Sequence, residues 1–68
     1  MKKKLIINGK NTFVLSKTLL KVLSEINIIS NQNIAIAVNE KVIEKNNWKN
    51  HKIKSGDIIE IVRPLKGG

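Results

Sequence analysis

The sequence predicts an α+β domain, in which one helix packs across a mixed sheet of four to five strands. Short apolar runs bounded by turn residues recur along the chain, and each has the length of a strand. One segment alone repeats apolar residues at the spacing of a helix. The 68 residues suffice for one small domain, and a domain of this size buries about 60% of its unfolded surface. The expected order is two strands, one helix and two to three further strands.

The first half of the chain is predicted to form a hairpin followed by the helix. Leu5–Ile7 is the first strand, and Asn8-Gly9 is the turn, because both turn positions accept positive φ. Asn11–Leu15 is the returning strand, and Ser16 or Thr18 is the expected helix N-cap. The helix buries one stripe of side chains and exposes the opposite face; the stripe is Leu19, Leu20, Val22, Leu23 and Ile26, and the exposed residues are Lys17, Lys21 and Glu25.

The second half is predicted to supply the remaining strands. A loop at 27–33 leads into a strand at Ile34–Val38, and a turn at 39–41 leads into an edge strand at Val42-Ile43. A short helical turn or loop follows at 44–50. A turn at Ser55-Gly56-Asp57 then comes before the last strand, Ile58–Val62. The alanines of the third strand favour a close crossing by the helix. Trp48 is expected to cover the edge of the core, where it is partly buried.

Alternation along the strands predicts an apolar patch on the face opposite the helix. Successive side chains of a strand point to opposite faces of the sheet. If Ile59 and Ile61 point into the core, Ile58 and Val62 point away from it. The same reasoning sends Ile6 outward from the first strand. We therefore expect Ile6, Ile58 and Val62 to form a patch on which a partner docks.

The composition excludes several classes of site. There is no cysteine and one histidine, His51, so we expect no disulfide, no metal ligand set and no cysteine nucleophile. No apolar run approaches the ~20 residues of a membrane span. The opening residues start like a signal peptide, but the apolar stretch stops at Asn8. We expect a protein of the cytoplasm, or of an organelle stroma if the gene is plastid-encoded.

The net charge of +8 does not by itself predict nucleic-acid binding. The lysines are scattered along the chain, and only Phe13 and Trp48 are aromatic, so there is no platform on which single-stranded bases stack. Lysine, asparagine and isoleucine are all encoded by AT-rich codons, which explains much of the charge. The charge still favours encounter with an acidic partner.

Gly67 and Gly68 end the sequence, after a short segment that follows the last strand. Residues 1–62 are therefore predicted to form the domain, and residues 63–68 a flexible tail. Pro64 lacks an amide donor, so strand pairing ends there. Two glycines would give the final carboxylate a backbone without side chains, which fits a narrow enzyme channel. The competing interpretation is a plain flexible end or an expression scar.

Several stretches, in this order, carry a resemblance to a known family. They are Ile36-Ala37-Val38-Asn39 followed by Val42, then Trp48, then Ser55-Gly56-Asp57 and an apolar strand that leads to Gly67-Gly68. The chain resembles the ThiS family, the sulfur carriers of thiamin biosynthesis. The resemblance covers essentially the whole chain. It implies the ubiquitin-like β-grasp fold.

The resemblance also implies a reaction at Gly68. In this family an E1-like (ThiF-like) activating enzyme uses ATP and Mg to adenylate the terminal carboxylate. Sulfur from the persulfide of a cysteine desulfurase then gives a thiocarboxylate, and a ThiG-like thiazole synthase consumes that sulfur. Adenylation is needed because a free carboxylate is ionised at neutral pH and is a poor electrophile. The chain would be a protein co-substrate and not an enzyme, with no catalytic residue, bound cofactor or metal of its own.

The tail residues expected to enter the partner's channel precede Gly68; they are Arg63, Pro64, Leu65, Lys66 and Gly67. Six residues reach roughly 20 Å when extended. Arg63 and Lys66 would contact acidic channel walls or nucleotide phosphates, or else are ordinary solvated charges.

Three other functions stay open. Pro64-Leu65 ahead of the diglycine is also similar to the sulfur carrier of molybdopterin synthesis. A ubiquitin-like modifier would use the same adenylated diglycine but form amides with lysines of other proteins. In the third, the chain is a binding module on the same scaffold, and the tail is dispensable.

Overall fold

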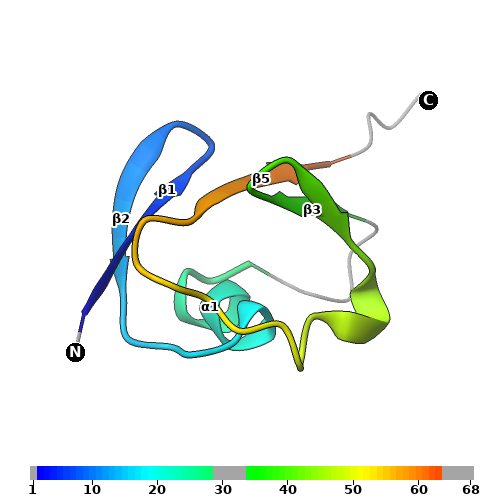
Figure 1. Cartoon of the computed structure of the whole chain (residues 1–68), viewed down its shortest axis with the longest axis horizontal. Coiled ribbons are helices and arrows are strands. Elements are labelled where there is room, and N and C mark those ends of the chain that lie inside the picture. The colour runs from blue at the N-terminus through cyan, green and yellow to red at the C-terminus, as the bar shows by residue number, and fades with distance from the viewer. Residues whose placement is uncertain (1, 29–33, 64–68) are drawn as a thin grey trace.

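In the computed structural model, the described residues form one five-stranded sheet, and an α-helix packs across one face of it (Figure 1). The structure describes residues 2–28 and 34–63. In chain order the elements are β1 (Lys3–Ile7), β2 (Lys10–Val14), α1 (Leu19–Glu25), β3 (Ala35–Val38), β4 (Lys41–Ile43), the 3-10 turn η1 (Lys45–Asn47) and β5 (Ile58–Val62). The predicted α+β class is confirmed. The predicted bounds of β5 agree with the observed ones, and those of the other strands differ by one or two residues at one or both ends.

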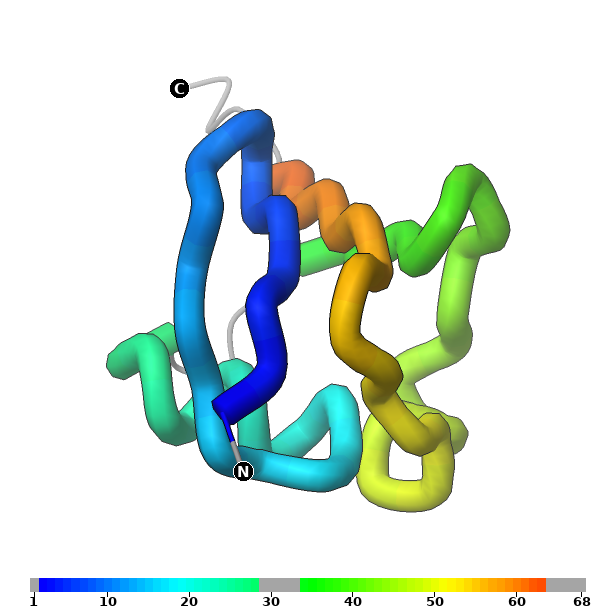
Figure 2. The backbone as a smooth tube through the Cα atoms, turned by 60° about the vertical axis from the view of Figure 1, so that its left-hand side comes forward, coloured from blue at the N-terminus to red at the C-terminus, as the bar shows by residue number. Residues whose placement is uncertain are grey.

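The first and last strands lie side by side at the centre of the sheet. The strand order is β2-β1-β5-β3-β4. β1 and β5 are parallel, with Ile6 opposite Ile58, whereas β1–β2, β3–β4 and β3–β5 are antiparallel. The β1–β2 turn and the end of β5 therefore lie at the same end of the sheet (Figure 2). The chain leaves the domain from a central strand.

The predicted Asn-Gly hairpin is confirmed, and its turn has the expected backbone. Asn8 has φ 50° and Gly9 has φ 82°, the positive values that a two-residue turn between twisted strands needs. The turn sets the register in which Ile7 lies opposite Lys10. Since side chains alternate along a strand, this register places Leu5 and Ile7 on the helix face.

Helix α1 is held at its first turn by contacts from a distant segment. Of the two candidate caps, Thr18 is the N-cap, and its hydroxyl accepts a hydrogen bond from the Lys21 N–H at 3.4 Å. The N–H groups of Leu19 and Leu20 donate to the carbonyls of His51 and Trp48 at 2.8 and 3.0 Å. These bonds satisfy donors that a helix leaves free at its start. A helix this short would not persist alone, so it depends on this segment and on the core.

Ser16, the other candidate cap, instead donates hydrogen bonds to Glu25, the last residue of α1. The Glu25 carboxylate accepts the N–H groups of Leu15 and Ser16 at 2.9 and 3.0 Å, and the Ser16 hydroxyl at 2.6 Å. The Ser16 hydroxyl and these backbone N–H groups hold the pKa of Glu25 below its ordinary value. Glu25 is exposed, as predicted, and it also ties the β2–α1 connection to the last helical turn, which the sequence did not indicate.

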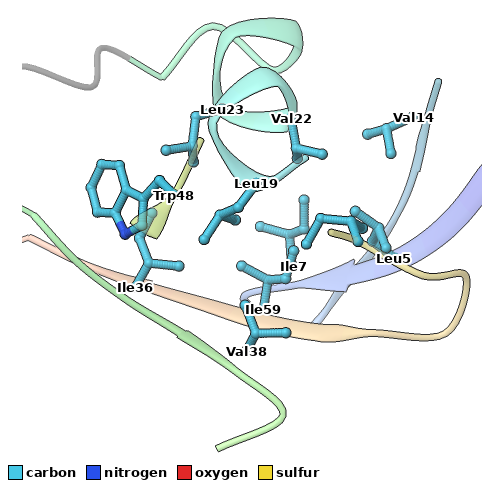
Figure 3. Close-up of a cluster of buried hydrophobic side chains, with 11 residues drawn as sticks. Leu5, Ile7, Val14, Leu19, Val22, Leu23, Ile36, Val38, Trp48 and Ile59 are labelled. Carbon is cyan, nitrogen blue, oxygen red and sulfur yellow. The ribbon is translucent and has the colours of Figure 1, made fainter. Parts of the chain in front are cut away.

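The core fills the space between α1 and the sheet (Figure 3). Three buried side chains come from the helix and face those of four strands. Among the residues that the structure describes, the buried ones are Leu5, Ile7, Val14, Leu19, Val22, Leu23, Ile36, Val38, Trp48, Ile53 and Ile59. Leu20, Ile26 and Ile61 are half-buried and pack against this cluster. The predicted helix stripe is therefore confirmed, because each of its five residues is either buried or half-buried.

Trp48 lies deeper than the sequence indicates. It is 1% exposed, and its indole N–H donates to the Ile43 carbonyl at 2.9 Å. A buried indole needs such a partner for its N–H. The expectation of a partly buried Trp48 is therefore wrong, because the whole side chain is part of the core.

The alanines of β3 do not face the helix. Ile36 and Val38 are buried, whereas Ala35 is exposed and Ala37 is half-buried. Because side chains alternate, the two alanines lie on the outer face, which is the sheet face opposite α1. The expectation of a close helix crossing at the alanines is therefore wrong.

Candidate functional site at the end of strand β5

The predicted reactive segment begins where β5 ends. Val62, the last residue of β5, lies opposite Ala35, and Arg63 comes next as an exposed residue. The remaining predicted tail residues, Pro64, Leu65, Lys66, Gly67 and Gly68, lie outside the described residues. The described part of the site is therefore the strand from which that segment leaves, with the outer face and the turn beside it.

The outer face carries the three residues of the predicted patch. Ile6 and Ile58 lie opposite each other on β1 and β5, and Val62 lies on the same face of β5, since it is four residues further along. Ile58 is 47% and Val62 60% exposed, whereas Ile6 is half-buried. The three residues therefore share one face, as alternation predicts, and Glu60 lies between Ile58 and Val62 along the strand.

Two further apolar side chains, which were not predicted to belong to the patch, also lie on the outer face. Phe13 on β2 pairs with Lys4 and is 61% exposed; Val42 on β4 pairs with Ala37 and is 74% exposed. Directly paired residues share a face, so both belong with the patch residues. The hairpin register fixed by Asn8-Gly9 was the signal that would have placed Phe13 there. We call these five residues, Ile6, Phe13, Val42, Ile58 and Val62, the outer apolar patch.

Two asparagines flank β5, one on each side, and their side chains bond to its backbone. The Asn8 Oδ1 accepts the Ile61 N–H at 2.8 Å, and its Nδ2 donates to the Ile61 carbonyl at 3.3 Å. The Asn39 Oδ1 accepts the Ile58 N–H at 3.0 Å, and its Nδ2 donates to the Asp57 carboxylate at 3.0 Å. Both asparagines have positive φ, 50° and 51°. The sequence predicted both as turn residues, which is confirmed, but gave no sign of their partners on β5.

A shallow groove lies beside the base of the predicted tail. It has a volume of about 640 Å³ and is lined by Ile7, Asn8, Lys10, Thr12, Ile26, Ile28, Ile61 and Arg63. Its charged lining residues, Lys10 and Arg63, are both cations. The isoleucines make much of the surface apolar. A partner segment that carries an acidic group beside an apolar one would suit this groove.

Other kinds of site have no support in the described part of the chain. Within residues 2–28 and 34–63, no three of the His, Cys, Asp and Glu side chains are grouped as metal ligands would be. No helix among these residues is long and apolar enough to cross a membrane.

Comparison with known proteins identifies one family. The model of the ThiS family matches residues 5–68, which includes the domain and the Gly67-Gly68 end. No curated protein matches the sequence.

Two solved structures from Geobacter metallireducens are similar to this fold. A crystal structure of its thiamine biosynthesis protein ThiS has a TM-score of 0.81 and 24% identity, over 96% of this chain and 99% of that one. A solution NMR structure of a thiamine biosynthesis protein from the same organism has a TM-score of 0.74 and 24% identity, over 96% and 87%. At this identity the likeness shows the fold, which is the predicted β-grasp arrangement.

Proposed function

The chain belongs to the ThiS family of sulfur carriers, and on that premise we propose that Gly68 carries the sulfur, as a C-terminal thiocarboxylate used to build the thiazole ring of thiamin. The observation that carries the proposal is the family match, which runs from β1 to the diglycine. The structure supports the proposal in one further way. The strand that precedes the diglycine, β5, lies in the middle of the sheet and pairs with both β1 and β3.

The proposed chemistry needs no catalytic group from this chain. In an activating enzyme of the E1 type (ThiF-like), a Gly68 carboxylate oxygen attacks the α-phosphorus of Mg-ATP, which releases pyrophosphate and leaves an acyl-adenylate. The outer sulfur of a cysteine desulfurase persulfide then displaces AMP and leaves an acyl disulfide. A second thiol of the partner enzymes attacks the enzyme-side sulfur of this bond, which forms an enzyme disulfide and releases the thiocarboxylate. The thiocarboxylate gives its sulfur to a ThiG-like thiazole synthase. In this proposal the chain is a co-substrate of these enzymes in the cytoplasm, and ATP and Mg belong to the activating enzyme.

The contribution of the chain is recognition and delivery. Arg63 to Gly68 would span roughly 20 Å when extended, enough to place a carboxylate inside a channel while the domain stays outside. Two residues of the outer apolar patch, Ile58 and Val62, belong to β5, the strand that leads into this segment. We propose that the activating enzyme docks on this patch. Arg63 and Lys66 would then meet acidic groups at the channel entrance.

Intact mass spectrometry tests the proposal directly. The protein is incubated with ATP, Mg, an E1-type enzyme and a sulfur donor, and its mass is compared before and after. A gain equal to the exchange of one oxygen for sulfur, placed on Gly68 by fragmentation, is the expected result. The matched controls delete Gly68 or append one residue after it; both are expected to fold normally and to gain no sulfur.

A negative result would be informative about the alternatives. If an enzyme pair that is active on another carrier leaves this protein unchanged, the binding-module function becomes the better explanation of the outer apolar patch. If sulfur is gained, the acceptor separates a thiamin carrier from a molybdopterin carrier. Amide bonds to lysines of other proteins would instead indicate a modifier.

A further inference from the structure

The hydrogen bonds of Asn8 continue the β1–β5 ladder beyond the end of β1. The Asn8 backbone N–H donates to the Ile59 carbonyl at 2.9 Å. In a parallel ladder the next bond would run from the Ile61 N–H to the Asn8 backbone carbonyl. The chain turns away at Asn8, whose φ is 50°, and the side-chain Oδ1 accepts that N–H instead, at 2.8 Å.

The carboxamide of Asn8 thus acts as a substitute peptide group. Its Oδ1 takes the Ile61 N–H and its Nδ2 reaches the Ile61 carbonyl at 3.3 Å. On its other edge, Ile61 lies opposite Ile36 of β3. Both backbone groups of Ile61 are therefore bonded on the β1 side, even though β1 pairs directly with β5 only at Ile58 and Ile59. The Asn8 side chain fixes β5 two residues before Arg63.

We propose that Asn8 is a positioning residue for the reactive C-terminal segment, because it sets the direction in which the chain leaves β5. This inference rests on the proposed function. Seven residues come after Ile61, and extended they span at most about 24 Å. The order of Ile61 and of the residues directly after it decides where Arg63 leaves the domain. If these residues are less ordered in the free protein, an enzyme that seats the following segment loses more conformational entropy on binding.

Asn39 supplies the matched control within the same strand. It has nearly the same φ as Asn8, it ends the strand on the other side of β5, and its Oδ1 accepts the Ile58 N–H. Its backbone N–H also donates to the Ile58 carbonyl at 2.7 Å, so that carbonyl stays bonded when the side chain is removed. Asn39 acts at the start of β5 and Asn8 near its end. Loss of either carboxamide should cost similar stability, but only loss of Asn8 should affect the end of β5 and the chain beyond it.

The test compares Asn8→Gly with Asn39→Gly in the full chain. Glycine keeps the positive φ at both positions and removes only the side chain. The first measurement uses no partner enzyme: amide hydrogen exchange at Ile61 and ¹⁵N relaxation at Val62 and Arg63. Faster exchange and greater motion are expected in Asn8→Gly, with Asn39→Gly close to wild type at these three amides. Equal changes in both variants, or none in either, would overturn the proposal.

The second measurement is steady-state adenylation by an E1-type enzyme. For Asn8→Gly we expect kcat/KM to fall about threefold to tenfold, the range for one hydrogen bond of ordinary strength. The fall should appear as a higher KM, because the residues after Ile61 are less ordered in the free variant and must be ordered when the enzyme binds. Asn39→Gly should match wild type. A fall in kcat alone, or equal falls in both variants, would overturn the positioning role. Absence of wild-type turnover would instead count against the proposed function, and the amide measurements would still decide the role of Asn8.

Discussion

Adjacent residues of β5 give the sharpest test of which face each side chain occupies. Ile59 is 1% exposed and packs under α1, whereas Ile58 is 47% exposed on the outer face. Truncation of a fully buried isoleucine to alanine costs about 2–5 kcal/mol, because a cavity is left as well as the lost transfer free energy. Full burial of an isoleucine side chain stabilises the fold by about 1.5–3 kcal/mol, and Ile58 is about half-exposed, so its burial contributes roughly half of this. Its truncation leaves no cavity, so Ile58→Ala should cost about 1 kcal/mol.

The assay is urea unfolding followed by tryptophan fluorescence. Trp48 is the single tryptophan of the chain and is buried in the core, so its emission reports loss of the fold. At about 0.05–0.15 kcal/mol per residue, a domain of this length has a free energy of unfolding of about 3–10 kcal/mol. With an m-value of about 1 kcal/mol/M, the urea midpoint should fall by about 1 M in Ile58→Ala and by about 2 M or more in Ile59→Ala.

The comparison can refute the register of β5. A shift of one residue would exchange the faces of every side chain in the strand. If Ile58→Ala lost as much stability as Ile59→Ala, or more, the assignment of Ile58 to the outer face, where docking is proposed, would be wrong. The outer apolar patch would then lose its central residue.

Three further predictions concern the core, the acid response and docking. Trp48→Phe removes the indole N–H that donates to the Ile43 carbonyl and part of a buried ring; we expect a loss of about 1–3 kcal/mol in the free energy of unfolding, measured by circular dichroism in urea. Because the pKa of Glu25 is lowered in the folded state, its stabilisation is complete above the unfolded-state pKa and is lost as pH falls through the folded-state pKa. The wild-type urea midpoint should therefore fall with acid more than that of Glu25→Gln, and parallel curves for the two proteins would contradict this. Val62→Lys should leave the thermal midpoint nearly unchanged, whereas Ile6→Lys, at a half-buried position, should lower it by about 4–8 °C without unfolding the domain. Both should weaken adenylation about fivefold or more; unchanged adenylation kinetics would remove the outer apolar patch from the docking proposal.

The local features of the fold were predictable from the sequence because short-range chemistry decides them. Asn8-Gly9 encodes the hairpin turn through the φ values that both residues accept. The bounds of β5 were predicted as observed, since an apolar alternating run comes directly after a turn. Burial of Ile59 and exposure of Ile58 and Val62 could be inferred from alternation alone.

The candidate site was predictable only in part. The patch residues on β1 and β5 could be assigned because each strand was read correctly, but Phe13 and Val42 joined them only when strand pairing was known. The interpretation of the β3 alanines was wrong because residue size does not say which face of a sheet meets a helix.

By itself the sequence determined the elements, the turn chemistry and the facing of the side chains of β1 and β5, since these depend on neighbours a few positions away. The tertiary structure alone decided the partners of the polar side chains. Asn8 bonds Ile61, which is 53 positions further along the chain, and Trp48 supplies a carbonyl to the start of α1. Contacts of this kind form only when the parallel pairing of β1 with β5 brings distant segments together, because each hydrogen bond needs its two groups at about 3 Å.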